Sequence, residues 1–513
     1  MRSQVFVLCV CVGLCVVECG NILAILPFIG KSHFFSYEPI LAALARRGHD
    51  VTVVSKFPRT SPLKGYTDID VRNPETTEVK INLTKIEIFG ILGEEVMEKI
   101  EEFLIDFESV FKRDDFQRLL HGNVSFDLVI TEVFVSDMFN GVAYKFNAPL
   151  VGIISSTVLP WANDRFGIPD NPSYIRSTFY PGVGEMTFYD RILNTFALMI
   201  SKVFYDYYIS SRDEVISKRY LGSDTPPVKD IVKNTSLLLT NSHFSLNQAR
   251  PFPPNVIEIS GAHLKQLKPL PQDIQNFLDE SKDGVVYFSL GTVVDTSSMS
   301  ELKRRAFCDS FAKLKQRVLW KWELGDMPDK PANVKTVKWM PQAEVLAHPN
   351  VRVFIGHGGL LGTIESVSNG VPMIGIPVFG DQHQNIETLV NFGTAVALDF
   401  AKIDEYSLTK ALNAVLFDSK YKTNAKLLSD RFNDRPLPPI DTATFWIEYV
   451  MRHRGAHHLR PSGVHLPWYQ YFLLDVILLL LLFVIVVVYF TSLFVKRIYK
   501  LIFTKDKIKL KTK

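Results

Sequence analysis

The chain has 513 residues, of which 47% are hydrophobic and 22% are charged, so it can form two or three domains with large cores. Its formal net charge is only +3, and eight Lys and Arg residues lie between 496 and 513, which leaves the rest of the chain slightly negative. This balance excludes the broad basic surface of a nucleic-acid-binding protein.

The first 20 residues have the pattern of a secretory signal peptide. Arg2 precedes an apolar run over residues 5–17, which is too short to span a bilayer, so we expect cleavage near residue 19 or 20. Four of the five cysteines lie in this region, and Cys308 remains as an expected buried thiol without a disulfide framework. The secretory route makes three sequons candidates for glycosylation, at Asn82, Asn123 and Asn234.

The first half, residues 21–260, reads as an α/β domain with a parallel sheet. A strand at 22–26, a loop at 27–36, a helix and a strand at 51–54 form a βαβ unit. Further buried strands are expected at 126–131, 150–154, 237–240 and 256–259, with a helix at 137–146. Residues 160–230 read as an aromatic-rich insertion, whose part up to residue 210 could form walls of a ligand pocket.

The second half repeats this organisation after a Pro-containing linker at 261–275. Residues 276–455 contain expected strands at 285–290, 318–321, 334–337, 351–355, 373–376 and 395–398, with a helix near 300–315 and helices up to about residue 453. The sequence therefore predicts an α/β protein of two Rossmann-like domains that face each other across a cleft.

A transmembrane helix is predicted near the C-terminus, within residues 470–495. Residues 476–495 carry no charge and would span about 30 Å as a helix, which matches the bilayer core. The basic tail at 496–513 predicts a cytosolic C-terminus and a type I orientation. Its final lysines resemble a dilysine retrieval signal of the endoplasmic reticulum, although a generic basic stop-transfer tail would look similar.

A glycine turn between a strand and a helix is the strongest candidate binding site. Gly356, Gly358 and Gly359 follow the strand at 351–355, and a helix is expected from about residue 361 to 369. Free backbone N–H groups and the positive end of a helix dipole favour an anion, so we expect a phosphate-bearing ligand.

Other polar and aromatic residues stand at or near expected strand ends, where open α/β sheets bind ligands. Trp339 could stack on a nucleobase or pack in the core, His357 could donate to a phosphate or be a core histidine, and Glu365 could accept from ribose hydroxyls or face solvent. The full set of candidate ligand contacts is Gly291, Thr292, Trp339, Gln342, His357, Gly359, Thr363, Glu365, Asp381 and Gln382.

Five segments in the second half closely resemble the UDP-glycosyltransferase family, in its membrane-anchored animal branch and most of all its insect members. These segments are WKWE (320–323), NVKTVKWMPQ (333–342), LAHPNV (346–351), HGGLLGTIES (357–366) and GIPVFGDQ (375–382). The resemblance covers essentially the whole chain and implies a GT-B fold. It implies an inverting transfer of glucose or glucuronic acid from a UDP-sugar to a small lipophilic acceptor, without metal or cofactor, in the lumen of the endoplasmic reticulum. Insect members favour glucose, and the sequence leaves open whether the chain forms homo-oligomers.

The resemblance also implies roles for single residues. His33 matches the family's catalytic base, and the expected acidic partner is usually an aspartate after the strand at 126–131. Here Glu132 occupies that slot, and Asp137 is the nearby alternative. UDP and its sugar would occupy the candidate contacts named above. The sequence departs from the family pattern at Gly356, where Ser or Thr is usual, and at Leu361, where several branches have Asn.

Three rival functions are less well supported. A nicotinamide or flavin enzyme needs G-x-G-x-x-G, but Leu361 stands where the third glycine belongs. A metal-dependent glycosyltransferase would use D-x-D, and Asp68-Ile69-Asp70 lies in an early polar stretch outside any nucleotide context. A non-catalytic carrier of small hydrophobic ligands would keep the pocket and lose the transfer, and the presence of His33 argues against it.

Overall fold

The computed structural model describes residues 19–73, 81–83, 93–180, 182, 184–292 and 294–509. The predicted signal peptide lies outside these residues except for Cys19 and Gly20. The chain divides into one unit that ends at Arg460 and a second unit from Pro461 to Lys513. We describe each unit by itself, beginning with the larger one.

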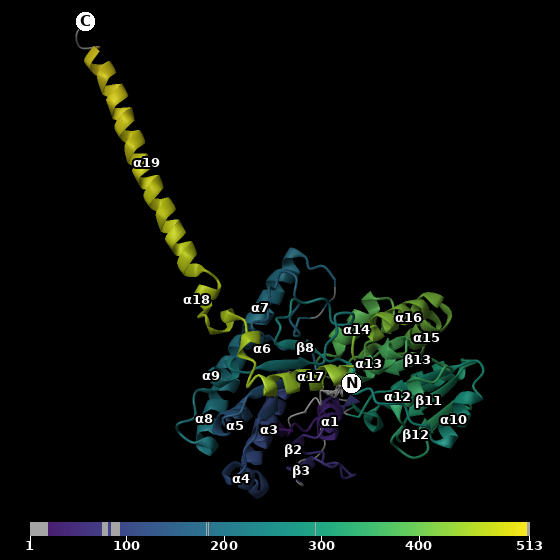
Figure 1. Cartoon of the computed structure of the whole chain (residues 1–513). Helices are drawn as coiled ribbons and strands as arrows, with labels where there is room; N and C mark the ends of the chain where they lie inside the picture. The colour runs from purple at the N-terminus through teal and green to yellow at the C-terminus, as the bar shows by residue number, and fades with distance from the viewer. Residues whose placement is uncertain are drawn as a thin grey trace, which may run out of the picture. The chain divides into compact units, whose positions relative to one another are not determined.

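A seven-stranded parallel sheet forms the centre of the first half, in the order β3-β2-β1-β5-β6-β7-β8 (Figure 1). Its strands are β1 (Asn21–Leu26), β2 (Asp50–Ser55), β3 (Tyr66–Asp70), β5 (Leu128–Glu132), β6 (Leu150–Ile154), β7 (Leu237–Thr240) and β8 (Val256–Glu258). The central strands are apolar along most of their length because helices cover both faces of such a sheet. The sequence missed only the edge strand β3, which is polar and half-buried.

The helices of the first half are α1 (Lys31–Arg46), α3 (Gly93–Phe111), α4 (Asp114–His121), α5 (Gly141–Lys145), α6 (Pro160–Phe166), α7 (Phe188–Phe204), α8 (Ser210–Leu221) and α9 (Val228–Lys233). Two expectations were wrong here. Residues 31–36 are the first turns of α1 and not a loop, because burial of Phe34 and Tyr37 against the sheet extends the helix toward β1. The helix expected at 137–146 is a 3-10 turn (Met138–Asn140) followed by the short α5.

The second half has a six-stranded parallel sheet in the order β12-β11-β9-β13-β14-β15. Its strands are β9 (Val285–Ser289), β11 (Arg317–Lys321), β12 (Val334–Val337), β13 (Val351–Gly356), β14 (Met373–Gly375) and β15 (Ala395–Ala397). Its helices are α10 (Gln272–Asp279), α11 (Glu301–Ala312), α12 (Gln342–Leu346), α13 (Leu360–Ser368), α14 (Gln382–Asn391), α15 (Glu405–Phe417) and α16 (Ser419–Asn433). Cys308 is buried in α11, as expected, and α10 begins inside the stretch assigned to the linker.

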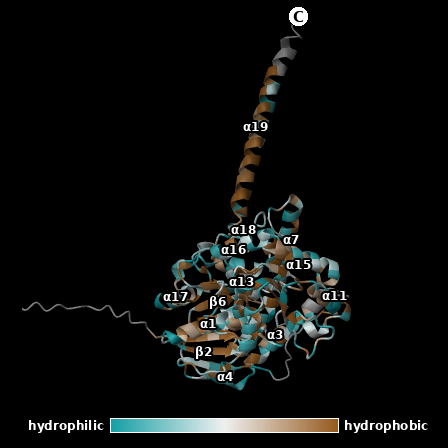
Figure 2. Cartoon of the chain, turned by 90° about the vertical axis from the view of Figure 1, so that its right-hand side faces the viewer, coloured by the Kyte–Doolittle hydropathy of each residue, from teal (hydrophilic) through white to brown (hydrophobic). Residues whose placement is uncertain are grey.

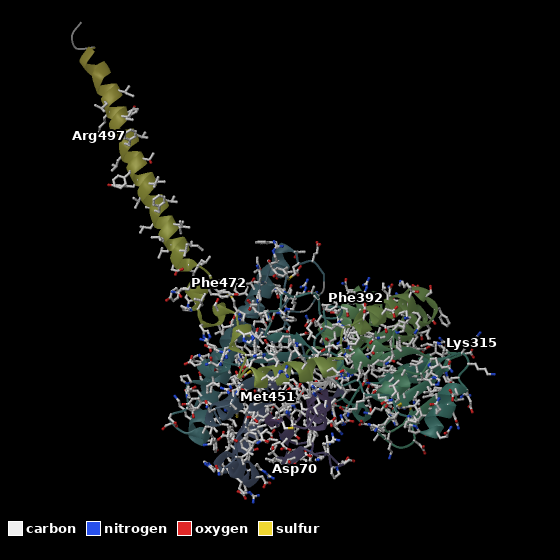
Figure 3. All side chains as sticks on the ribbon, viewed as in Figure 1. Asp70, Lys315, Phe392, Met451, Phe472 and Arg497 are labelled. Carbon is white, nitrogen blue, oxygen red and sulfur yellow. The ribbon has the colours of Figure 1, made fainter. Side chains whose placement is uncertain are left out.

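The last helix of this unit, α17 (Pro439–Arg452), returns to the first half. Its buried Ala443, Ile447 and Val450 belong to the same core cluster as β1 and α1. Glu448 accepts two hydrogen bonds from the Arg47 guanidinium, at 2.5 and 2.8 Å. Met451, labelled in Figure 3, lies beside Gly20 at the start of β1. The helix α17 thus lies within the range predicted for the second domain, 276–455, and packs on the core of the first half.

Three further contacts join the two halves. The short strands β4 (Ile81–Asn82) and β10 (Val294–Asp295) pair in parallel as a separate two-stranded sheet. The Gly182 N–H donates to Glu387 Oε2 on α14, at 2.6 Å. The Lys265 ammonium of the linker donates to Glu38 Oε2 on α1, at 3.0 Å. The two halves are thus joined by contacts of several separate segments, besides the linker itself.

The second unit contains α18 (Trp468–Tyr471) and the long helix α19 (Leu474–Lys509). The helix over residues 474–502 contains an 18-residue window with a mean hydropathy of 3.1 and is long and apolar enough to cross a membrane. Figure 2 shows α19 hydrophobic along most of its length. The apolar helix begins at Leu474 and not at residue 470, because a turn at Leu473, with φ 55°, separates it from α18. Residues 510–513 of the predicted cytosolic tail lie outside the described residues.

The return of α17 can be tested by a change in its buried face. We expect Ile447→Ala, at a side chain with no exposed surface, to lower the free energy of unfolding by about 3 kcal/mol, because it leaves a cavity in the core that α17 shares with β1 and α1. Phe445→Ala on the same helix removes a side chain that is 45% exposed and should cost less than about 1 kcal/mol. Urea unfolding of the detergent-solubilised protein measures both. Equal losses in the two variants would contradict the packing described here.

Candidate functional site

His33 lies in the first turn of α1 and is held by Glu132 at the end of β5. The two side chains are joined by a hydrogen bond of 2.5 Å between His33 Nδ1 and Glu132 Oε1. The carboxylate is almost fully buried, whereas the imidazole is 18% exposed. Because an ionised carboxylate only accepts hydrogen bonds, Nδ1 carries the proton and Nε2 keeps its lone pair. The arrangement can therefore supply a general base that faces outward from the sheet.

Two further residues hold this pair, and the sequence analysis missed both. Tyr37, one helical turn after His33, donates its hydroxyl to Glu132 Oε1 at 2.8 Å. Burial, with the nearby charge of Glu132, raises the pKa of Tyr37 well above its ordinary value, so the hydroxyl stays protonated. Ser155, after β6, lies 2.9 Å from His33 Nδ1 through its Oγ and also hydrogen-bonds to Tyr37. A buried tyrosine in a helix looks like any core residue, so only its i, i+4 spacing from His33 could have identified it.

Asp137, the alternative partner, belongs to a different network. Its carboxylate accepts from Arg165 Nη1 at 2.6 Å and from the Tyr205 hydroxyl at 2.7 Å. The side chains of Asp137 and Arg165 are both buried. The structure thus brings Glu132 and not Asp137 to His33, and Asp137 anchors the α6 and α7 region to the loop after β5.

Aromatic and aliphatic side chains surround the exposed side of His33. The rings of Phe28 and Phe134 lie 4.4 and 4.6 Å from the imidazole, centroid to centroid. A small cavity next to Glu132 is lined mainly by apolar side chains, namely Ile25, Pro27, Phe107, Phe134, Val135 and Phe139. The surroundings of the His33–Glu132 pair are thus mainly apolar.

In the second half, His357 lies between two glycines at the ends of β9 and β13. A Cβ atom on Gly291 would come within 2.6 Å of the imidazole, and one on Gly359 within 2.4 Å. Gly358 has a φ of +81°, and a Cβ there would meet Ile386 at 2.5 Å. A larger residue at any of these glycines would therefore clash with a neighbouring side chain of the protein itself, whether or not a ligand approaches the backbone.

Unpaired polar atoms mark the start of α13 as a binding site. Among the residues that the structure describes, His357 Nδ1 and Thr363 Oγ1 are buried and have no hydrogen-bond partner. Burial, with the charge of Lys321, lowers the pKa of His357 to about 4, so the ring is neutral at pH 7. Buried polar groups in native proteins nearly always have partners, and a ligand can supply the missing ones. Together with the free N–H groups of α13, these atoms suit a phosphate.

A half-buried carboxylate, Glu365, lies on the same helix, two residues after Thr363. Glu365 accepts from Gln342 Nε2 at 2.6 Å, and the Tyr287 hydroxyl donates to Gln342 Oε1 at 3.0 Å. Burial raises the pKa of Glu365 to about 7. Trp339, three residues before Gln342, is 68% exposed, so it is not a core residue and its ring is free to stack on a ligand.

Asp381 lies beside the glycine turn, just before α14. Burial raises the pKa of Asp381, and the hydrogen bond from Asn385 and the charge of His33 in the first half lower it. Asn385 Nδ2 donates to Asp381 Oδ2 at 2.9 Å and to the Gly358 carbonyl at 3.0 Å, which fixes the carboxylate beside the glycine turn.

Two of the predicted contacts are placed less directly. Gln382 is buried and its Oε1 accepts from the N–H groups of Val378 and Phe379, at 2.9 and 3.2 Å, so it holds its own loop. Thr292 is exposed at the end of β9. The D-x-D candidates Asp68 and Asp70 lie on the edge strand β3 and bond to Arg59 and Arg72.

The three sequon asparagines, Asn82, Asn123 and Asn234, are all exposed, which a glycosylated residue requires. Thr84 of the first sequon lies outside the described residues.

Comparison with known proteins places the chain among glycosyltransferases. A family model described as "UDP-glucoronosyl and UDP-glucosyl transferase" matches residues 21–509. The chain is 42% identical to UDP-glycosyltransferase UGT5 of Dactylopius coccus, over 89% of this chain and 88% of that protein. It is 33% identical to UDP-glucuronosyltransferase 2B17 of Mus musculus, over 90% of each. The calicheamicin glycosyltransferase CalG4 shares the fold, with a TM-score of 0.57, 16% identity and coverage of 85% of this chain and 99% of that one.

The raised pKa of Glu365 predicts how stability depends on pH. The folded carboxyl titrates near pH 7 and the unfolded one near 4.5, so the folded state holds an extra proton between these values and stability falls as the pH rises. As the pH rises from 4.5 to 7.5, we expect the free energy of unfolding of the Glu365→Gln variant to rise by about 2–3 kcal/mol relative to that of the parent protein. Urea unfolding at several pH values measures this difference. Glu301→Gln, at a side chain 66% exposed on α11, is the control and should show none, and an equally flat difference for Glu365→Gln would disprove the burial effect.

Proposed function

The chain belongs to the UDP-glycosyltransferase family, with the GT-B fold, and we propose that it transfers a hexosyl group from a UDP-sugar to the hydroxyl of a small lipophilic acceptor, with inversion and without a metal ion. The observation that carries this proposal is the hydrogen bond between His33 Nδ1 and Glu132 Oε1 at 2.5 Å. It leaves His33 Nε2 as a candidate general base in the first half.

The second half binds the donor in this proposal. Uracil stacks on the exposed Trp339 and meets Gln342, and the ribose hydroxyls donate to Glu365. The diphosphate receives hydrogen bonds from His357, Thr363 and the N-terminus of α13, which supply the partners that the buried atoms lack. The charge of Lys321, felt by His357, adds to the electrostatic stabilisation of the leaving group.

The sugar lies at Asp381, whose carboxylate accepts from its hydroxyls, beside Gln382. The acceptor binds in the first half, in the apolar surroundings of Phe28, Phe107 and Phe134. This placement puts acceptor and leaving UDP on opposite sides of the sugar, which supports a single in-line displacement with inversion.

The reaction needs one proton transfer. His33 Nε2 takes the proton of the acceptor hydroxyl while the hydroxyl oxygen attacks C1 of the sugar, and the bond from C1 to the UDP oxygen breaks. Glu132 keeps the imidazole in the required tautomer and stabilises the imidazolium that forms, as the carboxylate does in other histidine-based sites. Tyr37 is a positioning residue, because it holds the carboxylate of Glu132.

The cellular setting follows from the two ends of the chain. We propose that the predicted signal peptide is removed, that α19 anchors the protein in the endoplasmic reticulum membrane, and that the catalytic halves and glycosylated Asn82, Asn123 and Asn234 face the lumen. The apolar length of α19 and the exposure of the three asparagines support this. The 40% identity to UDP-glucosyltransferase 2 of Dactylopius coccus, against 33% to a mouse glucuronosyltransferase, favours UDP-glucose over UDP-glucuronate as donor.

Loss of the base should abolish transfer without loss of donor binding. We expect His33→Ala to lower kcat at least about 100-fold while the Kd for UDP stays within about twofold, because His33 contributes only to the acceptor step. Membranes that contain the protein are incubated with UDP-glucose or UDP-glucuronate, a panel of phenols and EDTA, and UDP binding is measured by calorimetry. Unchanged product formation would reject His33 as the base, and no product from the parent protein with any donor would favour a hydrophobic-ligand carrier.

A neutral substitution should lower activity at Glu132 and stability at Asp137. Glu132→Gln is expected to lower kcat by about two to four orders of magnitude with little loss of stability, because the imidazole loses its orienting charge. Asp137→Asn is expected to lower the free energy of unfolding by about 3 kcal/mol, because Arg165 stays buried with its partner neutralised. Kinetics and urea unfolding on both variants separate the roles, and a kcat loss larger in Asp137→Asn than in Glu132→Gln would reverse the assignment.

A further inference from the structure

The predicted cleavage region of the signal peptide leads directly into a buried space beside β1. Gly20 is buried, whereas Cys19 before it is exposed. A Cβ atom on Gly20 would lie 2.7 Å from Met451 Cε on α17 and 3.3 Å from Asp127 Oδ2 before β5. This narrow space around Gly20, which we call the Gly20 slot, therefore lies between α17 and the segment before β5.

A short chain of hydrogen bonds connects the backbone nitrogen of Gly20 with α17. The Gly20 N–H donates to His49 Nδ1 at 3.1 Å, and this imidazole is only 1% exposed. His49 Nε2 lies 3.3 Å from Glu448 Oε1. Because Nδ1 accepts a hydrogen bond, Nε2 carries the proton of the neutral ring and donates to the carboxylate. The nitrogen of residue 20 is therefore two hydrogen bonds away from the helix that returns from the second half.

We propose that the signal peptide is cut between Cys19 and Gly20, and that the freed α-ammonium group of Gly20 stays in the Gly20 slot and anchors β1 to α17. In the cut, a peptidase of the secretory route adds water across the amide bond, so that Cys19 keeps the new carboxylate and Gly20 the new amine. The amine takes up a proton at neutral pH, because α-amino groups titrate near pH 8. This inference needs the secretory route described above but not the transfer reaction.

Two observations favour this bond over the next one along the chain. A cut before Gly20 is preceded by Val17 and Cys19 at the third and first positions, where small uncharged residues are typical. A cut after Gly20 would place the charged Glu18 at the third position. It would also remove the Gly20 carbonyl, which accepts from the Asp50 N–H at 3.1 Å at the start of β2. The Asp50 N–H and the imidazole beside it would then lose their partners.

The Gly20 slot offers acceptors for the three N–H donors of an ammonium group. His49 Nδ1 accepts the first, and Asp127 Oδ2 lies beside the Gly20 Cα atom for the second. Cys19 is exposed, so its departure opens the third to water. A charged donor makes a hydrogen bond about twice as strong as a neutral one, so the cut strengthens the contact with His49. The charged groups on the neighbouring segments are Asp127 before β5, Arg47 and Asp50 on either side of His49, and Glu448 and Arg452 on α17.

The test compares forms of the full chain that are produced in eukaryotic secretory cells and purified in detergent. The parent protein is compared with a matched control that carries one extra glycine between Cys19 and Gly20. The extra glycine keeps the residues before the bond and moves the ammonium group about 3.8 Å along the chain. The same pair is made with His49→Gln, which removes the imidazole. N-terminal sequencing locates the cut, and thermal unfolding at pH 7 and pH 10 measures the stability.

We expect the parent protein to begin at Gly20 and the extra glycine to lower its melting temperature by at least about 1.5 °C at pH 7. The partners of the ammonium group raise the pKa of the folded amine, so its contribution is full below about pH 8 and is lost as the pH rises through that higher pKa. The difference between the two proteins should therefore shrink by at least about half at pH 10. With His49→Gln, the extra glycine should change the melting temperature little.

Four results would each overturn the proposal. They are a parent protein that begins at another residue, equal melting temperatures of the first pair at pH 7, a difference that persists at pH 10, and an equal loss in the pair without His49. The sequencing and the pH comparison need no substitution of His49, so they decide the matter even if His49→Gln does not fold. Because no measurement here uses sugar transfer, a negative result leaves the assays on His33 unaffected.

Discussion

The hydrogen bond between His33 and Glu132 is the interaction on which the proposed chemistry depends. His33 lies in the first turn of α1 in one half, and Asp381 precedes α14 in the other, so in our proposal each half supplies part of the chemistry. In both halves the side chains stand at the carboxyl ends of parallel strands, where helices start and backbone N–H groups are free. The contacts of α17, β4 with β10, and Gly182 with Glu387 keep these two edges opposed.

Several polar groups at the proposed donor site lower the stability of the folded chain as long as no ligand is bound. Glu365 and His357 are both half-buried, and desolvation raises the pKa of Glu365 to about 7 and lowers that of His357 to about 4. Thr363 leaves a buried hydroxyl unpaired. Such groups destabilise a protein unless a ligand completes them, which is why strongly shifted pKa values gather at binding sites. The proposed acceptor side shows the reverse, since Glu132 and Ser155 already contact His33 Nδ1 and Tyr37 donates to Glu132.

Much of the fold could be predicted because buried parallel strands are short continuous apolar runs, as in residues 22–26 and 150–154. The edge strand β3 could not, since it is polar and half-buried. The return of α17 to the first core has no local signal, because an amphipathic helix does not show which core it covers. Sequence spacing also left Glu132 and Asp137 open, and only the geometry separates them.

The central claim is that the donor bound by the second half presents its sugar to His33 of the first. The most direct measurement is a cryo-EM or crystal structure of the full chain with an unreactive UDP-sugar analogue. The account predicts uracil on Trp339, the diphosphate within hydrogen-bonding distance of His357 and Thr363, and C1 of the sugar facing the His33 imidazole beside Asp381. A diphosphate bound away from α13, or a sugar directed away from His33, would contradict it.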